Sequence, residues 1–169
     1  MTIDPNIPHE YLWLLRRTDG YLDLNMLGRA RQELEGFPKR YRDATAYREI
    51  ALRLAMDEED WPTVEAVART LLNRKPNDPV LWIDLAYATR RLESVEAASA
   101  ILSEARDRFP NEPIIPFNLA CYACQLGNKT SALQLLEQAT ALAPQCRAMA
   151  LEDEDLEPIW GALESQPDS

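Results

Sequence analysis

Cys121 and Cys124 are separated by two residues, a spacing that occurs in metal sites and in thiol–disulfide sites. A structural zinc site needs four ligands, and the remaining cysteine, Cys146, has no histidine near it. A redox pair usually lies at a helix N-terminus, which lowers the pKa of the thiol, whereas this pair falls in the middle of an expected helix. The pair therefore predicts small residues packed in a helix, with a redox-sensitive pair as the alternative.

Other residues that could do chemistry are scattered. The single histidine, His9, lies beside Pro8 before the first expected helix, so a serine or cysteine triad has no suitable base. The five glycines form neither a phosphate-binding loop nor a dinucleotide turn. Most acidic residues fall on outward helix positions, where water solvates their carboxylates. We expect a protein that is not an enzyme and that binds no metal and no cofactor.

The chain is acidic, with a formal net charge of -10 over 169 residues. This charge argues against nucleic acid and anionic membranes as partners, because both are recognised through clustered Lys and Arg. The first residues lack a secretory signal, and no window approaches the roughly 18 apolar residues that a membrane span needs. Three cysteines suit a reducing compartment better than a disulfide framework. We therefore expect a soluble cytoplasmic protein.

The chain repeats itself every 34 residues. Pro76, Pro110 and Pro144 are separated by this step. Three further registers share it: Ala30, Val64, Ala98 and Ala132; Leu34, Ala68, Leu102 and Leu136; and Phe37, Leu71, Ala105 and Ala139. Within each unit, apolar and small residues recur with the period of a helix, which predicts two amphipathic helices per unit.

Local signals place the helix ends. Each repeated proline lacks an N–H and is expected to follow the end of a second helix. Asp78, Ser94 and Asn128 are expected to be N-caps. Gly127 and Asn25 suit the tight turns between paired helices.

These positions resemble the tetratricopeptide repeat (TPR). Residues 118–128 and 149–160 also resemble stretches of small bacterial proteins of this family. Residues 79–112 and 113–146 follow the pattern closely, except that Pro116 replaces a large apolar residue. In residues 45–78, the first-helix residues Tyr47, Ile50, Ala51 and Leu54 occur one residue early. Residues 11–44 form a degenerate repeat. The resemblance implies an all-α, right-handed solenoid of about four antiparallel helix pairs.

Segments outside the repeats complete the predicted organisation. Residues 1–10 are expected to be a flexible N-terminus, residues 147–163 a C-terminal cap, and residues 164–169 a tail. A capping helix over 155–163, N-capped by Asp155, is predicted from the spacing of Leu156, Ile159, Trp160 and Leu163. The acidic run 152–155 is expected to be a solvated turn, or alternatively a docking tail for a basic partner.

The resemblance also implies a concave groove, lined by the first helix of each repeat, that binds a peptide or helix of a partner. The expected groove residues are Arg53, Ile83, Asp84, Tyr87, Arg90, Arg91, Phe117, Asn118, Cys121 and Gln125. Their aromatic rings could anchor an apolar side chain, and their arginines could bind an acidic peptide. The alternative for Arg90 and Arg91 is that they complement the C-terminal dipole of a helix ending near Leu92.

Three alternative functions are considered for such a protein. The first is a protein-binding adaptor. The second is a small chaperone of a bacterial secretion or assembly system. The third is a module that self-associates through Tyr11, Trp13 and Leu14. Binding of chaperone C-terminal tails is not expected, because only Asn118 matches the carboxylate clamp that the family uses for them.

Overall fold

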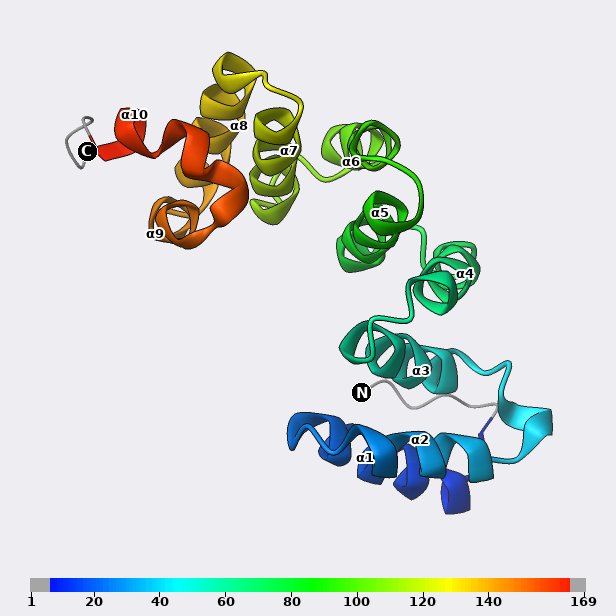
Figure 1. Ribbon diagram of the computed structural model, residues 1–169. Helices are drawn as coiled ribbons and strands as arrows, with labels where there is room; N and C mark the ends of the chain where they lie inside the picture. The colour runs from blue at the N-terminus through cyan, green and yellow to red at the C-terminus, as the bar shows by residue number, and fades with distance from the viewer. Residues whose placement is uncertain (1–6, 165–169) are drawn as a thin grey trace. The chain divides into compact units, whose positions relative to one another are not determined.

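The computed structural model describes residues 7–164, and every regular element in that range is helical (Figure 1). The elements are α1 His9–Asp23, α2 Leu27–Gly36, η1 Lys39–Tyr41, α3 Thr45–Asp57, α4 Trp61–Leu72, α5 Pro79–Leu92, α6 Val95–Arg108, α7 Ile114–Gln125, α8 Lys129–Leu142, α9 Gln145–Glu152, η2 Glu154–Ile159 and α10 Trp160–Glu164. The predicted N-terminal segment and tail lie largely outside the described residues, although α1 already begins at His9. Within 7–164, no helix is long and apolar enough to cross a membrane.

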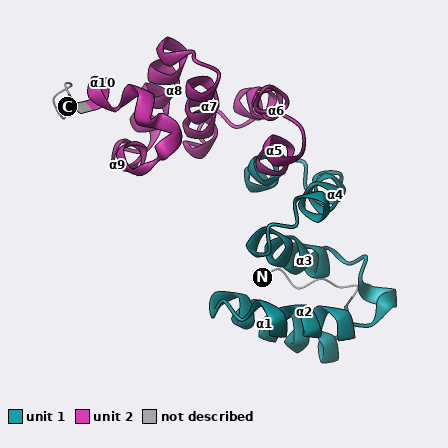
Figure 2. Cartoon of the chain, viewed as in Figure 1, with its two compact units in different colours: residues 1–84 teal, residues 85–169 magenta. Residues whose placement is uncertain are grey.

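The chain divides into two compact units, residues 1–84 and 85–169, with the boundary inside α5 (Figure 2). In unit 1, α1 packs against α2 and α3, and α3 packs against α4. In unit 2, α7 packs against α6, α8 and η2. Each unit therefore consists of consecutive helices packed on one another, as the repeat pattern predicts.

The 34-residue step identifies the core. All the residues in the three repeated registers are at most 5% exposed, from Ala30 to Ala139. They come from the second helices α2, α4, α6 and α8, together with Phe37 just after α2. Alanines and leucines recur at these positions because each second helix must approach its neighbours closely along one stripe.

Most predicted helix starts are confirmed. The side chains of Ser94 and Asn128 each accept a hydrogen bond, at 3.1 Å, from the backbone N–H three residues ahead. Asp78 accepts one from the N–H of Val80 at 3.2 Å, just before α5. These bonds satisfy donors that the first helical turn leaves without a partner.

The predicted tight turns are confirmed as well. Gly127 and Asn25, which follow α7 and α1, have φ angles of 79° and 53°. Glu59 adopts a similar φ of 57° after α3, which its residue type did not indicate. The turn at Glu59 therefore places an L side chain in the left-handed region, where glycine or asparagine is usual.

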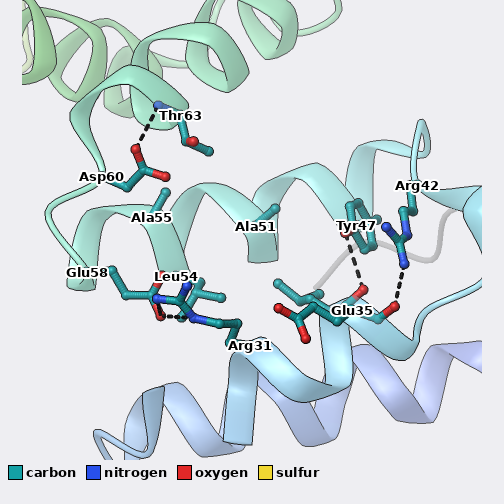
Figure 3. Close-up of a pocket in the computed structure, with 11 residues that line it drawn as sticks. Arg31, Glu35, Arg42, Tyr47, Ala51, Leu54, Ala55, Glu58, Asp60 and Thr63 are labelled. Atoms are coloured by element: carbon teal, nitrogen blue, oxygen red, sulfur yellow. Dashed lines mark hydrogen bonds and ion pairs between the residues drawn. The ribbon is translucent and has the colours of Figure 1, made fainter. Parts of the chain in front are cut away.

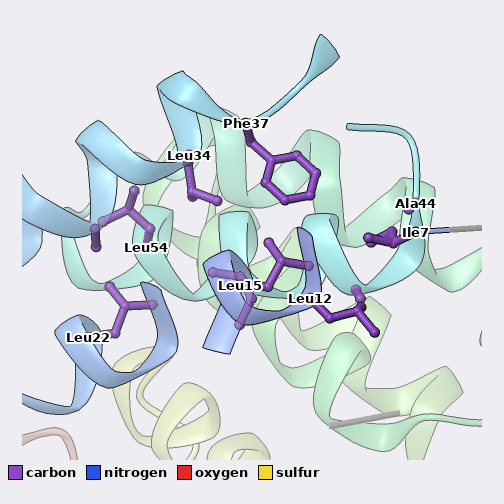
Figure 4. Close-up of a cluster of buried hydrophobic side chains, with 11 residues drawn as sticks. Ile7, Leu12, Leu15, Leu22, Leu34, Phe37, Ala44 and Leu54 are labelled. Carbon is purple, nitrogen blue, oxygen red and sulfur yellow. The ribbon is translucent and has the colours of Figure 1, made fainter. Parts of the chain in front are cut away.

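A hydrophobic cluster joins α1, α2 and α3 of unit 1 (Figure 4). Leu12, Leu15 and Leu22 of α1 lie with Phe37 and Leu54, which come from the end of α2 and from α3. Burying each large side chain contributes roughly 1.5–3 kcal/mol. The degenerate first repeat thus keeps a full apolar core.

Helix α3 is the one whose first-helix pattern is shifted. Ile50 and Leu54 are buried, whereas Tyr47 and Ala51 are only partly buried against the same cluster. Leu52 is also buried, and the equivalent residue one repeat later, Ala86, is fully buried. The buried face of α3 therefore includes a residue outside the shifted pattern.

The C-terminal segment differs from the single predicted helix. Residues 145–152 form α9, residues 154–159 form the 3₁₀ helix η2, and α10 begins only at Trp160. Pro158 lies inside η2 and has no N–H to donate, so a continuous α-helical ladder is interrupted there.

The predicted N-cap of this segment is wrong by two residues. Asp153, rather than Asp155, caps η2, and its side chain accepts a hydrogen bond from the Asp155 N–H at 2.9 Å. Of the four predicted apolar anchors, Leu156, Ile159 and Leu163 are at most 4% exposed, and Trp160 is partly buried. The cap therefore contains the expected apolar residues, but the Asp155 carboxylate does not serve as its N-cap.

Candidate functional site

The predicted groove residues belong to two separate groups. Arg53, Ile83 and Asp84 lie in unit 1. The other seven lie in unit 2, on α5 and α7, and we call this set the α5–α7 surface: Tyr87, Arg90, Arg91, Phe117, Asn118, Cys121 and Gln125.

Arg53 is bound by its own chain. Its guanidinium donates to Asp19 and Asp23 of α1, each at 2.6 Å. The hydrogen bond to Asp23, with that to Asp19, raises the pKa of Arg53. This arginine therefore links α3 to α1, and both its carboxylate partners belong to the first repeat.

Asp84 is the unusual acid of the predicted groove. Burial raises its pKa from 3.8 to about 6, and the charge of Asp78 adds to this effect. A carboxylate with little water around it is costly to ionise. Asp84 thus departs from the solvated behaviour expected of the acids on these helices.

Arg90 is the best-held cation of the α5–α7 surface. Its Nη1 donates to Asp155 Oδ2 at 2.7 Å, and its Nη2 donates to Oδ1 at 3.1 Å. The guanidinium also lies 5.5 Å from the ring of Tyr122, and the arginine side chain is only 19% exposed. This two-pronged geometry matches a planar carboxylate and makes the pair stronger than a single contact.

Two further residues of this surface contact the same segment. The Gln125 amide donates a hydrogen bond to Asp155. The Cys121 thiol donates one to Asp153 Oδ2, with an S···O distance of 3.5 Å. Burial, reinforced by the charge of Asp153, raises the pKa of the Cys121 thiol. Cys121 therefore stays a thiol that donates a hydrogen bond, and burial also raises the pKa of its neighbour Cys124.

The remaining residues differ in exposure. Arg91 donates to the Tyr87 hydroxyl at 3.0 Å and lies 5.2 Å from its ring, in the last turn of α5. Asn118 is partly buried. The ring of Phe117 is covered by its neighbours, because this residue is only 5% exposed. Tyr87 and Arg91 are thus the more open part of the surface.

The fold has counterparts among solved structures. No protein-family profile matches the sequence, and no curated protein matches it significantly. The structure of YrrB, a TPR protein with an unusual peptide-binding site, aligns with a TM-score of 0.63 over 92% of this chain and 86% of that chain, at 17% identity. The chain has the TPR fold. A second structure, MamA MSR-1 C2, aligns with a TM-score of 0.57 at 17% identity. The alignment covers 93% of the present chain and 96% of the MamA chain.

This fold is typical of proteins that bind other proteins without catalysing a reaction. The arginines of the predicted groove lie on first helices as expected, but their carboxylate partners were not predicted. Asp153 and Asp155 were expected in a solvated turn or a docking tail. The available signal was the run of four acidic residues, 152–155, directly before Leu156, an apolar anchor.

One group in the described part of the TPR chain has the spacing of a metal site. The ligand atoms of Cys121, Asp153 and Asp155 lie within 4.8 Å of one another. Arg90 and Gln125 already donate to the Asp155 carboxylate, and the thiol donates to Asp153. The arrangement therefore fits a hydrogen-bonded docking contact better than a set of ligands that converge on a cation.

A pocket of about 190 Å³ lies elsewhere, among α2, α3 and α4 of unit 1 (Figure 3). Arg31 and Glu58 form an ion pair at 2.8 Å along its wall, and Tyr47 donates to the Leu34 carbonyl. Arg31 and Glu58 are paired with each other, while Tyr47, Arg42 and Asp60 bond to backbone groups. Its size and lining do not favour it as a small-molecule site.

Proposed function

We propose that this chain is a protein-interaction module whose α5–α7 surface binds an acidic peptide or helix of a partner protein. The observation that carries this proposal is the pairing of Arg90 with Asp155, in which the guanidinium holds a carboxylate in two-pronged geometry. The peptide-binding site of YrrB, a protein of the same fold, supports it. The module acts as an adaptor. Its three buried cysteines are free thiols, which favours the reducing environment of the cytoplasm as its location.

The surface also explains the kind of peptide. Arg90 and Arg91 supply positive charge in a chain whose net charge is -10, so attraction of an acidic segment must be local. Tyr87 adds an aromatic ring beside Arg91 that can pack on an apolar side chain. The preferred ligand combines carboxylates with one large apolar residue.

A display library of random peptides, selected on the full chain, tests this function. We expect enrichment of acidic sequences with one large apolar residue. An Arg91→Glu variant should bind the selected peptides at least about tenfold more weakly, since it reverses a contacting charge. Arg108→Glu is the matched control, because Arg108 also lies in the last turn of its helix, α6, outside the surface.

Two outcomes would refute the proposal. If no peptide is selected, the proposal that the chain binds a peptide is refuted. Equal loss of affinity in Arg91→Glu and Arg108→Glu would mean that only overall charge matters.

Self-association is a second candidate, favoured by one residue. Trp13 is 51% exposed, with the Arg17 guanidinium 4.4 Å from its ring. Tyr11, in contrast, packs against Phe37 and Tyr41 within unit 1. If Trp13 mediates association, light scattering should find a mass that rises with concentration, and Trp13→Glu should remove the rise. A constant monomer mass would rule this candidate out.

A further inference from the structure

The α5–α7 surface is already occupied by the acidic turn, which we define as residues 153–155. Asp155 accepts from Arg90 and from Gln125, and Asp153 accepts from Cys121. We propose that the acidic turn is a built-in ligand that closes this surface, and that a partner binds there by displacing it. This inference rests on the proposed function and adds the regulation of its site.

The turn has the features of a peptide ligand. The carboxylates of Asp153 and Asp155 are separated by one residue, Glu154, and each of the two is held by side chains from α5 or α7. Leu156, which follows immediately, is fully buried, and Ile159 is 2% exposed. The turn therefore defines the chemical class of the displacing partner: two acidic residues separated by one, followed by a large aliphatic residue.

Glu154 and Glu157 show the selectivity of the contact. Both side chains are exposed and lie in the same acidic segment. Only the aspartates at 153 and 155 face cations or donors of the surface. A general attraction between acidic and basic segments would not distinguish neighbouring carboxylates in this way.

Covalent connection gives the turn an advantage over a free peptide. A segment tethered to its own binding site acts at an effective concentration of order millimolar or above. A peptide with identical contacts therefore competes poorly with the intact turn. A partner can displace the turn if it makes extra contacts, for example with Tyr87 and Arg91. It can also bind if the contact between the acidic turn and the α5–α7 surface has been weakened.

The first test needs no ligand and uses Cys121 as a reporter. This thiol is 2% exposed beneath Asp153, so a thiol reagent can reach it only when the turn opens. Asp155→Asn and Arg90→Gln should each increase the labelling rate of Cys121 by about tenfold, the change expected for losing a charge-assisted hydrogen bond. Glu157→Gln is the control within the same segment.

Cys146, which is fully buried, distinguishes opening of the turn from unfolding. Mass spectrometry should detect faster labelling at Cys121 only. Equal acceleration at Cys146, or no acceleration in either variant, would overturn the built-in ligand.

The second test adds a labelled peptide with the sequence of residues 151–160 to the full chain. The Asp155→Asn chain should bind it about tenfold more tightly than wild type, because its competitor is weakened. Adding Arg90→Gln to that variant should abolish the gain. Equal affinity of wild type and Asp155→Asn would overturn the proposal.

A third variant covers the case in which loss of the ion pair unfolds the cap. Asp153→Cys places a second thiol near Cys121, so oxidised glutathione should join the two and lock the turn shut. The locked chain should not bind the peptide, and reduction should restore binding to the same sample. Binding by the locked chain would contradict the inference.

These results separate the two proposals. If display-selected peptides bind wild type and Asp155→Asn equally well, peptide binding stands and the built-in ligand is refuted. If selection yields no peptide while Cys121 labelling responds to Asp155→Asn, the turn closes its surface and the proposed function is the part that fails.

Discussion

Asp84 is an acid whose pKa departs clearly from the ordinary value of its residue type. Its pKa of about 6 lies above the ordinary value of 3.8, so folding favours the protonated acid. Ionisation therefore costs stability at neutral pH. This cost is absent below about pH 4, grows through the interval between the two pKa values, and is complete above about pH 6.

Replacing Asp84 by asparagine tests this assignment. We expect Asp84→Asn to raise the free energy of unfolding at pH 7.5 by on the order of 1–2 kcal/mol, since the uncharged amide avoids the desolvation cost. The gain should disappear by about pH 4. Urea denaturation at several pH values measures it, with exposed Asp107→Asn as a control. A gain that does not change with pH would contradict the buried-charge explanation.

Single residues were predictable where their partners are near in sequence. Ser94 and Asn128 were expected to be caps because a capping side chain bonds to the backbone a few residues ahead. Arg90 could be placed on a first helix, but its partner Asp155 lies 65 residues away. Such a pair depends on how the cap folds back, which local spacing does not determine.

At the scale of the helix, the N-caps contribute measurable stability. Ser94→Ala removes the side chain that accepts from the Ala97 N–H and should lower the free energy of unfolding by about 1 kcal/mol. Ser99→Ala removes the same hydroxyl in the middle of α6, where alanine is the better helix former, and should be neutral or slightly stabilising. Urea titration of both variants measures the difference. Equal effects would show that Ser94 is not an energetically significant cap.

Packing between helices is tested at Leu102, which is fully buried on α6. Leu102→Ala should cost about 2–5 kcal/mol, because it leaves a cavity in a close-packed interface. Leu92→Ala makes the same deletion at a side chain that is 40% exposed and should cost less than about 1 kcal/mol. Comparable losses for the two variants would mean that the 34-residue register does not mark the core.

The helices of the repeats were predictable, whereas the C-terminal elements were not. Four second helices share one register, so a period could be recognised from the sequence alone. The segment after Pro144 has no repeat to compare with, and Pro158 divides it into a 3₁₀ helix and a short α-helix. Its apolar spacing predicted what is buried at Leu156 and Ile159, but not which backbone conformation carries them.

At the scale of the whole molecule, the repeat predicted the TPR fold but gave no sign of two compact units. A regular 34-residue period suggests a uniform array, yet the boundary inside α5 falls within residues 79–112, which follow the pattern closely. The predicted groove residues are consequently divided between the units. The seven in unit 2 include those that contact the acidic turn, and the proposed binding site therefore belongs to that unit.

The location of peptide binding is the central claim. It is tested most directly by amide chemical-shift changes in the full chain as a display-selected acidic peptide is added. We expect the largest changes at residues 85–92 of α5, 117–125 of α7 and the acidic turn, because the peptide replaces Asp155 beside Arg90. Changes confined to α6 and α8, or to unit 1, would contradict it.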